Sequence, residues 1–303
     1  MVLFLEGKTT NAESLIRDSI DILEGAGEGE SLVCVRRLRY LVQIYARSHR
    51  LQDTEKMQRR ILHIMELMKG WESMETVIAA EGLSLTLQSR GKLFEARELL
   101  ERCLDARKSL LPAGNLQIGA NLLQIAKLIM LDSDRLREIS ISEANRDLSL
   151  ARDYLNDSVR IAGQVLVKLR KQKANLQKNE TSDNIIKQGR AALVYLLQAL
   201  GSLGRLEIIR QQSMQFAPET SAAVNNAERE LLRCISAFKE FENEESLSNT
   251  PEVKKEYISC LKQLANLLES DKNMKESKRT MLDDLDKTLE QLIQHDDNKR
   301  STG

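Results

Sequence analysis

The stretch Ser89-Arg-Gly-Lys-Leu-Phe-Glu-Ala96 decides the fold, because related stretches precede it at a fixed step. Gly7-Lys8 opens the earliest of them and His49-Arg50 opens the next, so each lies 42 residues after the one before. A repeat of this length is typical of an array of helical units, each of which covers the apolar face of its neighbour. The sequence therefore predicts a repeated helical scaffold.

Each repeat contains two helices on either side of this stretch. A small residue follows the turn, and mostly apolar residues follow it at helical spacing, which places them on one helix face. A second apolar pattern with the same spacing precedes the turn. The residues after the turns are Ala12, Leu15, Ser19 and Ile20; Thr54, Met57, Ile61 and Leu62; and Ala96, Leu99, Cys103 and Leu104. Each unit is predicted to be an antiparallel helical hairpin, with Gly91 in the left-handed conformation that ends a helix.

The composition agrees with an all-α protein. Of 303 residues, 42% are hydrophobic and 30% are charged, while only 3 are proline and 14 are glycine. The 45 basic and 45 acidic residues balance, whereas proteins that bind nucleic acids or anionic membranes by charge usually carry a basic excess. The most apolar stretches, 122–131 and 191–203, are too short to span a bilayer. We expect no membrane insertion and regard nucleic acid as an unfavoured partner.

The repeat divides the chain into parts of different regularity. Extra residues around 133–146 predict an inserted turn or a lengthened helix, and Gly204 is a candidate for a further turn. The run from Lys168 to Lys178 is basic and is predicted to place cations at a helix C-terminus that leads into a loop. Trp71 is predicted to attach the connector between two hairpins to a neighbouring helix. The predicted parts are regular hairpins over 1–165 with a truncated first hairpin, a basic and polar connector over 166–184, degenerate hairpins over 185–295, and a disordered tail over 296–303.

The four cysteines are predicted to be reduced. Cys34, Cys103, Cys234 and Cys260 lie far apart and form no CxxC pair, which argues against a disulfide framework or a zinc site. We expect them to be buried as small apolar residues.

The beginning of the sequence predicts a cytoplasmic location. Its apolar run before Glu6 is too short for a secretory signal. The helix that should cover Leu15, Ile16 and Ile20 is missing or reduced to 2–5, so a shortened gene product is the favoured interpretation. An organellar location stays open, because an upstream targeting segment is one consequence of that interpretation.

These residues resemble tetratricopeptide repeats (TPRs), and the long step resembles the variety found in kinesin light chains. Gly91, Leu93, Glu95, Ala96 and Leu104 match the pattern, as do the segments 103–112 and 120–126. The resemblance implies a right-handed α-solenoid of helical hairpins, and a plant-type member of the group is one reading of it. Ser84 replaces a usual glycine of the pattern, and His49 and Lys272 replace turn glycines.

The resemblance also implies where a partner binds. In this family the first helix of each hairpin lines a concave groove, and the groove positions fall here on Arg36, Arg39, Gln43, Arg47, Ile78, Glu81, Leu85, Gln88, Leu123, Lys127 and Met130. We expect this groove to bind a peptide or protein partner, with arginines holding carboxylates and leucine and methionine contacting apolar side chains. The alternative is that these arginines only form a solvated face.

Catalysis is not expected. The three histidines, His49, His63 and His295, have no arrangement of partners that would form a catalytic site, and no HExxH, GxGxxG, GxSxG or phosphate-loop motif occurs. No cofactor or metal is expected. The alternative function is RNA binding by a helical-repeat array. Such arrays place variable polar pairs at fixed repeat positions, but Arg39, Glu81 and Leu123 share no such character.

Overall fold

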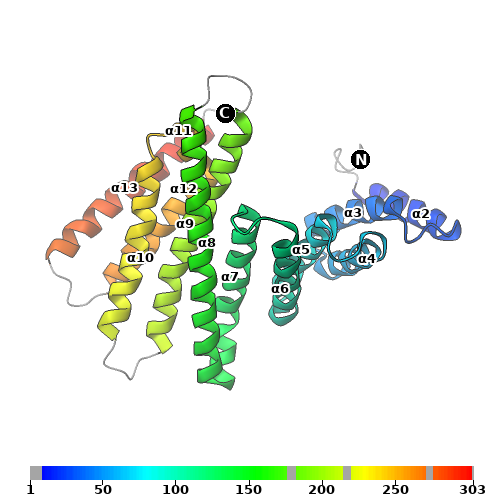
Figure 1. Cartoon of the computed structure of the whole chain (residues 1–303), viewed down its shortest axis with the longest axis horizontal. Helices are drawn as coiled ribbons and strands as arrows, with labels where there is room; N and C mark the ends of the chain where they lie inside the picture. Colours follow the sequence, from blue (N-terminus) through cyan, green and yellow to red (C-terminus); the bar gives the residue numbers. More distant parts are fainter. Residues whose placement is uncertain (1–8, 176–181, 214–219, 271–275, 302–303) are drawn as a thin grey trace. The chain divides into compact units, whose positions relative to one another are not determined.

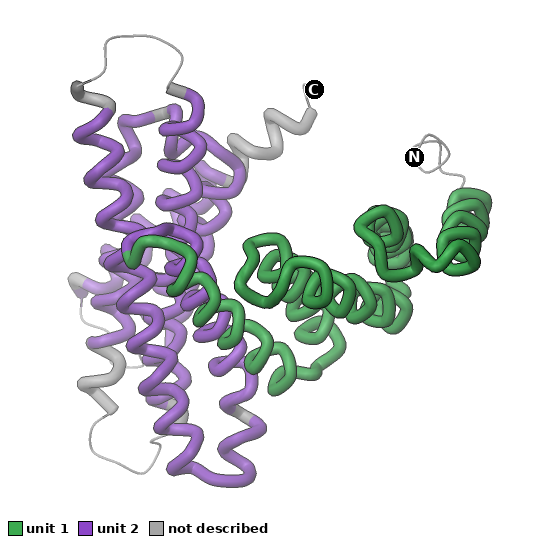
Figure 2. The backbone as a smooth tube through the Cα atoms, turned by 45° about the vertical axis from the view of Figure 1, so that its right-hand side comes forward, with its two compact units in different colours: residues 1–113 green, residues 114–303 purple. Residues whose placement is uncertain are grey.

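The computed structural model describes residues 9–175, 182–213, 220–270 and 276–301 (Figure 1). Every regular element in these ranges is a helix, and the helices follow one another as consecutive hairpins, which confirms the all-α fold class. The chain divides into two compact units, residues 1–113 and 114–303 (Figure 2).

The first unit is a simple linear array. Each helix packs mainly on its neighbours in sequence: α2 on α3, α3 on α4, α4 on α5 and α5 on α6. Ile20 is buried in the resulting core, whereas Leu15 is exposed on α2. The helices are α2 (Thr9–Gly25), α3 (Leu32–Arg47), α4 (Leu51–Lys69), α5 (Met74–Ser89) and α6 (Leu93–Leu110).

The predicted turns at His49 and Gly91 are confirmed. His49 has φ 55° and Gly91 has φ 74°, so both hold the left-handed conformation that ends a helix. In the first turn the Arg50 N–H donates to the Tyr45 carbonyl at 2.9 Å, and in the second the Lys92 N–H donates to the Leu87 carbonyl at the same distance. The turns expected at Gly7 and Lys272 lie outside the described residues.

Glu55 ties α4 to the turn that follows α5. Its carboxylate accepts hydrogen bonds from Lys92 at 2.9 Å, from the Arg59 Nε at 2.8 Å and from Arg90. Burial opposes ionisation of this carboxyl, but the bonds from Lys92, Arg59 and Arg90 outweigh it and lower its pKa to about 2. The ionised carboxylate therefore holds two consecutive hairpins together.

Trp71 attaches the connector between α4 and α5 to α6, as predicted. Its indole Nε1 donates to the Arg102 carbonyl at 3.3 Å. The Arg102 guanidinium lies 3.9 Å from the centre of the ring, which adds a cation–π contact. The tryptophan is structural.

The second unit is built around one central helix. α9 packs on α7, α8, α10, α11 and α12, and α12 also packs on α10 and α13. Figure 1 shows α8, α9 and α10 running alongside one another. The helices are α7 (Leu116–Ile139), α8 (Ile141–Asn175), α9 (Ser182–Ser213), α10 (Thr220–Phe241), α11 (Glu245–Ser248), α12 (Pro251–Glu269) and α13 (Glu276–Ser301).

The extra residues around 133–146 lengthen helices. α7 continues to Ile139 and α8 begins at Ile141, with Ser140 between them. Ser133 on α7 and Ala144 on α8 are both buried. Of the two predicted alternatives, the lengthened helix is therefore the one observed.

The predicted turn at Gly204 was wrong, because α9 runs through it without interruption. A Cβ atom built on Gly204 would lie 2.6 Å from the Cγ of Leu231 on α10, and one on Gly201 would lie 3.1 Å from the Sγ of Cys260 on α12. These glycines allow two helices to approach α9 closely. Glycine occurs both in turns and where helices approach closely, so the sequence alone does not distinguish the two roles. The packing does.

The prediction of a connector over 166–184 was wrong for residues 166–175 and 182–184, because α8 continues to Asn175 and α9 begins at Ser182. Leu169 is buried, and Arg170 pairs with Glu240 at 2.9 Å and with Glu244 at 3.2 Å. The helix therefore continues because partners from α10 and from the segment after it contact it. Residues 176–181 lie outside the described residues.

The prediction of a disordered tail over 296–303 was wrong for most of it, since α13 extends to Ser301. The polar composition that suggested a tail is compatible with helix. Residues 302–303 lie outside the described residues.

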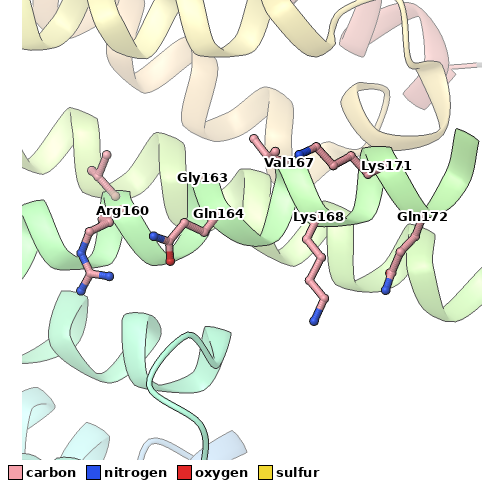
Figure 3. Close-up of a pocket in the computed structure, with 8 residues that line it drawn as sticks. Arg160, Gly163, Gln164, Val167, Lys168, Lys171 and Gln172 are labelled. Atoms are coloured by element: carbon pink, nitrogen blue, oxygen red, sulfur yellow. The ribbon is translucent and has the colours of Figure 1, made fainter.

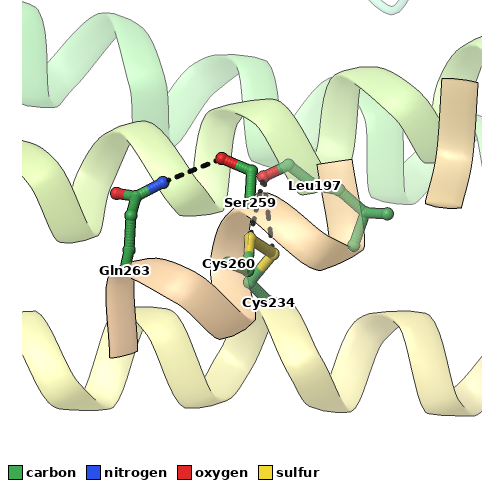
Figure 4. The surroundings of a disulfide bond; sticks show 5 residues. All are labelled: Leu197, Cys234, Ser259, Cys260 and Gln263. Carbon is green, nitrogen blue, oxygen red and sulfur yellow. Dashed lines mark hydrogen bonds between the residues drawn. A yellow bond between two sulfur atoms is a disulfide. The ribbon is translucent and has the colours of Figure 1, made fainter. Parts of the chain in front are cut away.

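Two of the four cysteines form a disulfide, which corrects the expectation of four reduced thiols. Cys234 on α10 and Cys260 on α12 are bonded, and their sulfurs lie 3.5 and 3.8 Å from the Leu197 carbonyl oxygen of α9 (Figure 4). The packing of α10 and α12 on α9 brings together cysteines 26 residues apart, which no local spacing reveals. Cys34 and Cys103 are free and buried, as expected.

One helix of the described chain is long and apolar enough to cross a membrane, at Asp183–Gln211 within α9. However, 67% of the apolar 18-residue window within that stretch is buried inside the protein. This burial is what the central helix of a helical core requires.

Candidate functional site

The α3 residues predicted to line a groove form one exposed stripe. α3 begins after Ser31, whose side chain accepts a hydrogen bond from the Cys34 N–H at 3.1 Å, a normal helix cap. One face of α3 is buried through Leu38, Leu41 and other apolar residues. The predicted set lies on the opposite face and is exposed: Arg36, Arg39, Gln43 and Arg47.

This stripe is basic and open to a ligand. Within the described part of the chain, Arg36 and Arg39 have no ion-pair partner, whereas Arg47 has an interaction of its own. A guanidinium presents a planar pair of donors that matches a carboxylate. Arg36 and Arg39 are therefore the two arginines that are free to hold an acidic group.

The α5 residues of the predicted set form a second stripe, which is partly apolar. Ile78 is 56% exposed and Leu85 is 53% exposed, and Glu81 and Gln88 are half-buried on the same stripe. Ile78 and Leu85 are spaced so that they lie two turns apart on one helix face. Two large exposed apolar side chains on one line are suited to contact with a partner.

Glu81 is already paired. It accepts from the Arg107 Nη2 at 2.7 Å and from the Nη1 of the same guanidinium, and Arg107 on α6 is buried. Sequence reasoning missed Arg107, because its partner lies 26 residues away on the other helix of the hairpin. The pair neutralises the acid, so it does not repel an acidic ligand beside Leu85.

The α7 residues of the predicted set do not form an exposed surface. Leu123 and Met130 are buried in the second unit, so the expectation that they contact a partner was wrong. α7 packs on both α8 and α9, and these contacts cover the side of α7 that carries Leu123 and Met130. The sequence could not show this, because α9 lies far along the chain.

Lys127 belongs to a polar chain that links three helices. Its Nζ donates to the Gln198 Oε1 at 2.9 Å, and the Gln198 Nε2 donates to the Glu256 Oε1 at 2.9 Å. Burial lowers the pKa of Lys127, while Glu256 opposes that effect and Arg205 adds to it. The ammonium is engaged in joining α7, α9 and α12.

Eight of the eleven predicted residues therefore stay candidates, and all eight belong to the first unit. α4 packs on both α3 and α5 and joins their two stripes. Among the described residues, no group of three or more His, Cys, Asp and Glu side chains could hold a metal ion. The arrangement offers charge and apolar contact to a partner.

The fold is that of TPR-like helical repeats, and known structures share it. The structure of BtubC (BKLC) from P. vanneervenii matches with a TM-score of 0.60 at 10% identity, over 97% of this chain and 92% of that one. A crystal structure of nearly identical TPR-like repeats, assigned to a kinesin light chain of Podosopora anserina, matches with a TM-score of 0.50 at 15% identity, over 85% of this chain and 93% of that one.

These similarities concern the fold. No protein-family model matches the sequence, and no curated protein matches it. The resemblance to kinesin-light-chain repeats is supported at the level of structure, while the plant-type reading has no support in these matches.

Proposed function

We propose that the protein is a non-catalytic interaction scaffold whose first unit binds an acidic peptide across α3 and α5. The observation that carries the proposal is the exposed pair Arg36 and Arg39, which have no ion-pair partner among the residues that the structure describes. They belong to the same unit as the exposed Ile78 and Leu85. TPR-like repeats are typically protein-interaction scaffolds, and the solved structures of this fold support that class.

The chemistry of the two stripes defines the peptide. Arg36 and Arg39 are three residues apart on α3, so both guanidinium groups extend from one face of the helix. They would bind carboxylates of Asp or Glu through charge-assisted hydrogen bonds. Ile78 and Leu85 would bury the apolar side chains of the peptide, and burial of such contacts contributes most of the affinity at small interfaces.

A displayed library of random peptides of about 12 residues, long enough to reach both stripes, tests the proposal on the full chain. We expect the recovered peptides to combine acidic and apolar residues. The double variant Arg36→Glu/Arg39→Glu should weaken the binding of a recovered peptide by about 2 kcal/mol or more, measured by fluorescence polarisation. Leu85→Ser should weaken it by about 1 kcal/mol.

A matched control uses the second unit. Lys127→Gln removes a cation from the predicted set, but Lys127 is engaged with Gln198. Peptide affinity should therefore stay unchanged in this variant. Equal peptide affinity in the wild type and in Arg36→Glu/Arg39→Glu would contradict the assignment. Binding of a poly(U) RNA that falls steeply with salt, and is lost in the arginine variant, would favour the RNA alternative instead.

A further inference from the structure

A groove of about 610 Å³ runs along one exposed face of α8. Its apolar lining, called here the floor, is Val159, Gly163 and Val167, and its cationic lining, called here the rim, is Arg160, Lys168 and Lys171. Figure 3 shows Val167 and Lys171 extending to one side of the helix and Arg160 and Lys168 to the other. All of these residues belong to α8, and none is among the residues that the repeat pattern predicted to bind. The surface is therefore separate from the stripes on α3 and α5.

The floor is hollow because Gly163 has no side chain. A Cβ built on Gly163 would meet nothing within 4 Å, unlike one built on Gly201 or Gly204. Glycine in a helix interior lowers helix stability, and no close approach inside the protein explains it here. Val159 and Val167 lie one turn to either side, and Val167 is 56% exposed. The space above Gly163 is therefore not filled by another part of the protein that the structure describes.

The rim is positively charged. Among the described residues, Lys168 and Lys171 have no ion-pair partner, and both are exposed. Arg160 pairs with Asp157 on the same helix at 2.8 Å, and both side chains are more than half exposed. Such an exposed pair is weak, so Arg160 is readily available to another carboxylate.

We propose that this groove docks an amphipathic helix of a partner protein, with acidic residues flanking an apolar stripe. From Val159 to Lys171 the groove covers about 18 Å, or roughly three helical turns, at about 1.5 Å per residue. The missing side chain at Gly163 lets a second helix approach α8 closely, because the distance between packed helices depends on the side chains at the contact. Apolar residues of the partner lie on the valines, and its carboxylates meet the three cations.

The same groove suits nucleic acid or lipid less well. Its lining in the described part of the chain contains no aromatic side chain, and stacking on aromatic rings is a main contribution to the binding of single-stranded nucleic acid. A membrane surface requires protruding apolar side chains, whereas the floor here is recessed at Gly163. Charge on the rim and apolar surface in the floor together favour an acidic helix.

A library of displayed helical peptides of about 20 residues, longer than the groove, tests the proposal on the full chain. Leucine is fixed at alternating third and fourth positions, and the remaining positions are random. We expect the enriched peptides to carry Asp and Glu beside the leucine stripe. Gly163→Phe fills the hollow, and Lys168→Glu/Lys171→Glu reverses the rim. Each should weaken binding of an enriched peptide by about tenfold or more in fluorescence polarisation.

Matched variants separate binding from folding and from net charge. Gly163→Ala should weaken the peptide less than Gly163→Phe does, and circular dichroism should show both variants folded. Lys187→Glu/Lys239→Glu changes the net charge equally at exposed lysines outside the groove and should leave affinity unchanged. Arg36→Glu/Arg39→Glu should also bind normally, which distinguishes this groove from the surface on α3 and α5.

Three outcomes would overturn the proposal. The first is that no acidic helical peptide is enriched. The second is that enriched peptides bind Gly163→Phe as well as they bind the wild type. The third is that vesicles of phosphatidylserine and phosphatidylcholine, or a poly(U) RNA, bind the full chain through the same residues while the helical peptides do not.

Discussion

In the first unit, a few residues of unusual conformation or burial determine how neighbouring helices are joined. His49 and Gly91 occupy corresponding turns with φ 55° and 74°, although only glycine adopts this conformation without steric cost. Glu55, by contrast, is a buried acid that keeps its charge because three cations surround it. The two turns set the geometry within a hairpin, and Glu55 fixes one hairpin to the next.

Substitutions at the two turns should change stability in opposite directions. His49→Gly relieves a left-handed side chain and should raise the free energy of unfolding by about 0.5–1 kcal/mol. Gly91→Ala introduces that strain and should lower it by about 1 kcal/mol. Urea unfolding followed by circular dichroism measures both. Gly114→Ala is the control, since Gly114 has no positive φ and open space around it; an equal loss there would contradict the explanation.

Removal of the Glu55 charge should destabilise the protein by about 3 kcal/mol near neutral pH, because Glu55→Gln takes the carboxylate partner from Arg90 and Lys92. The pKa of about 2 lies below the ordinary 4.5, so the folded state binds the proton more weakly than the unfolded chain. The stabilisation is therefore full above about pH 4.5 and is lost as the pH falls towards 2.

Urea unfolding of the wild type and Glu55→Gln at several pH values measures this effect. The difference between them should shrink as the pH falls from about 4.5 to about 2. Glu101→Gln, which breaks a partly exposed pair with Arg97 one turn away on the same helix, should cost only about 0.3–0.5 kcal/mol. A difference for Glu55→Gln that does not depend on pH would show that the carboxylate charge is not the cause.

At the scale of helices, glycines and a disulfide determine how the second unit packs. α9 accommodates α10 at Gly204 and α12 at Gly201, and the bond between Cys234 and Cys260 then joins α10 to α12. Two helices are thus fixed on one stretch of α9.

Two glycine-to-alanine substitutions should change the free energy of unfolding in opposite directions. Gly204→Ala places a methyl group against Leu231 and should lower the free energy of unfolding by about 1–3 kcal/mol. Gly163→Ala has open space and should raise it by about 0.5–1 kcal/mol, because alanine favours helix. Thermal unfolding measures both. Leu231→Ala should partly rescue Gly204→Ala, and an absence of rescue would mean that the close approach is not responsible.

Reduction of the disulfide should destabilise the second unit by about 3 kcal/mol, since the bond closes a long loop of the unfolded chain. The test compares urea unfolding with and without dithiothreitol. The double variant Cys234→Ser/Cys260→Ser should lose the response to dithiothreitol. Cys34→Ser should keep it, because Cys34 is a free thiol. An identical response in the double variant would exclude this bond as its origin.

The sequence could predict features that depend on neighbouring residues. The turns at His49 and Gly91 and the exposed stripe on α3 depend on local spacing, and the structure agrees with them. Other roles depend on segments far along the chain. Gly204 was predicted as a turn but packs against Leu231, and Cys234 was predicted as a free thiol but is bonded to Cys260. Leu123 was predicted to contact a partner but is buried. Lys127 was mispredicted for the same reason. Its hydrogen-bond partner Gln198 lies on α9, 71 residues further along the chain.

At the scale of the whole molecule, the two units use the same hairpins in different ways. Each helix of the first unit packs on its sequence neighbours, whereas α9 contacts five other helices of the second. The candidate peptide-binding residues that stay exposed belong to the first kind of unit. The groove on α8 belongs to the second, which gives the proposed docking helix a firmly packed support.

The central position of α9 has a consequence for how the protein opens. A linear array exchanges its amide hydrogens from its ends inward, because each repeat is held only by its neighbours. In the second unit, α9 cannot separate without α7, α8, α10 and α12 losing contacts at the same time. Hydrogen exchange followed by mass spectrometry should therefore show graded protection along α2 to α6. It should show nearly uniform protection across α9 and the helices around it, and graded protection there as well would mean that α9 is not the cooperative centre.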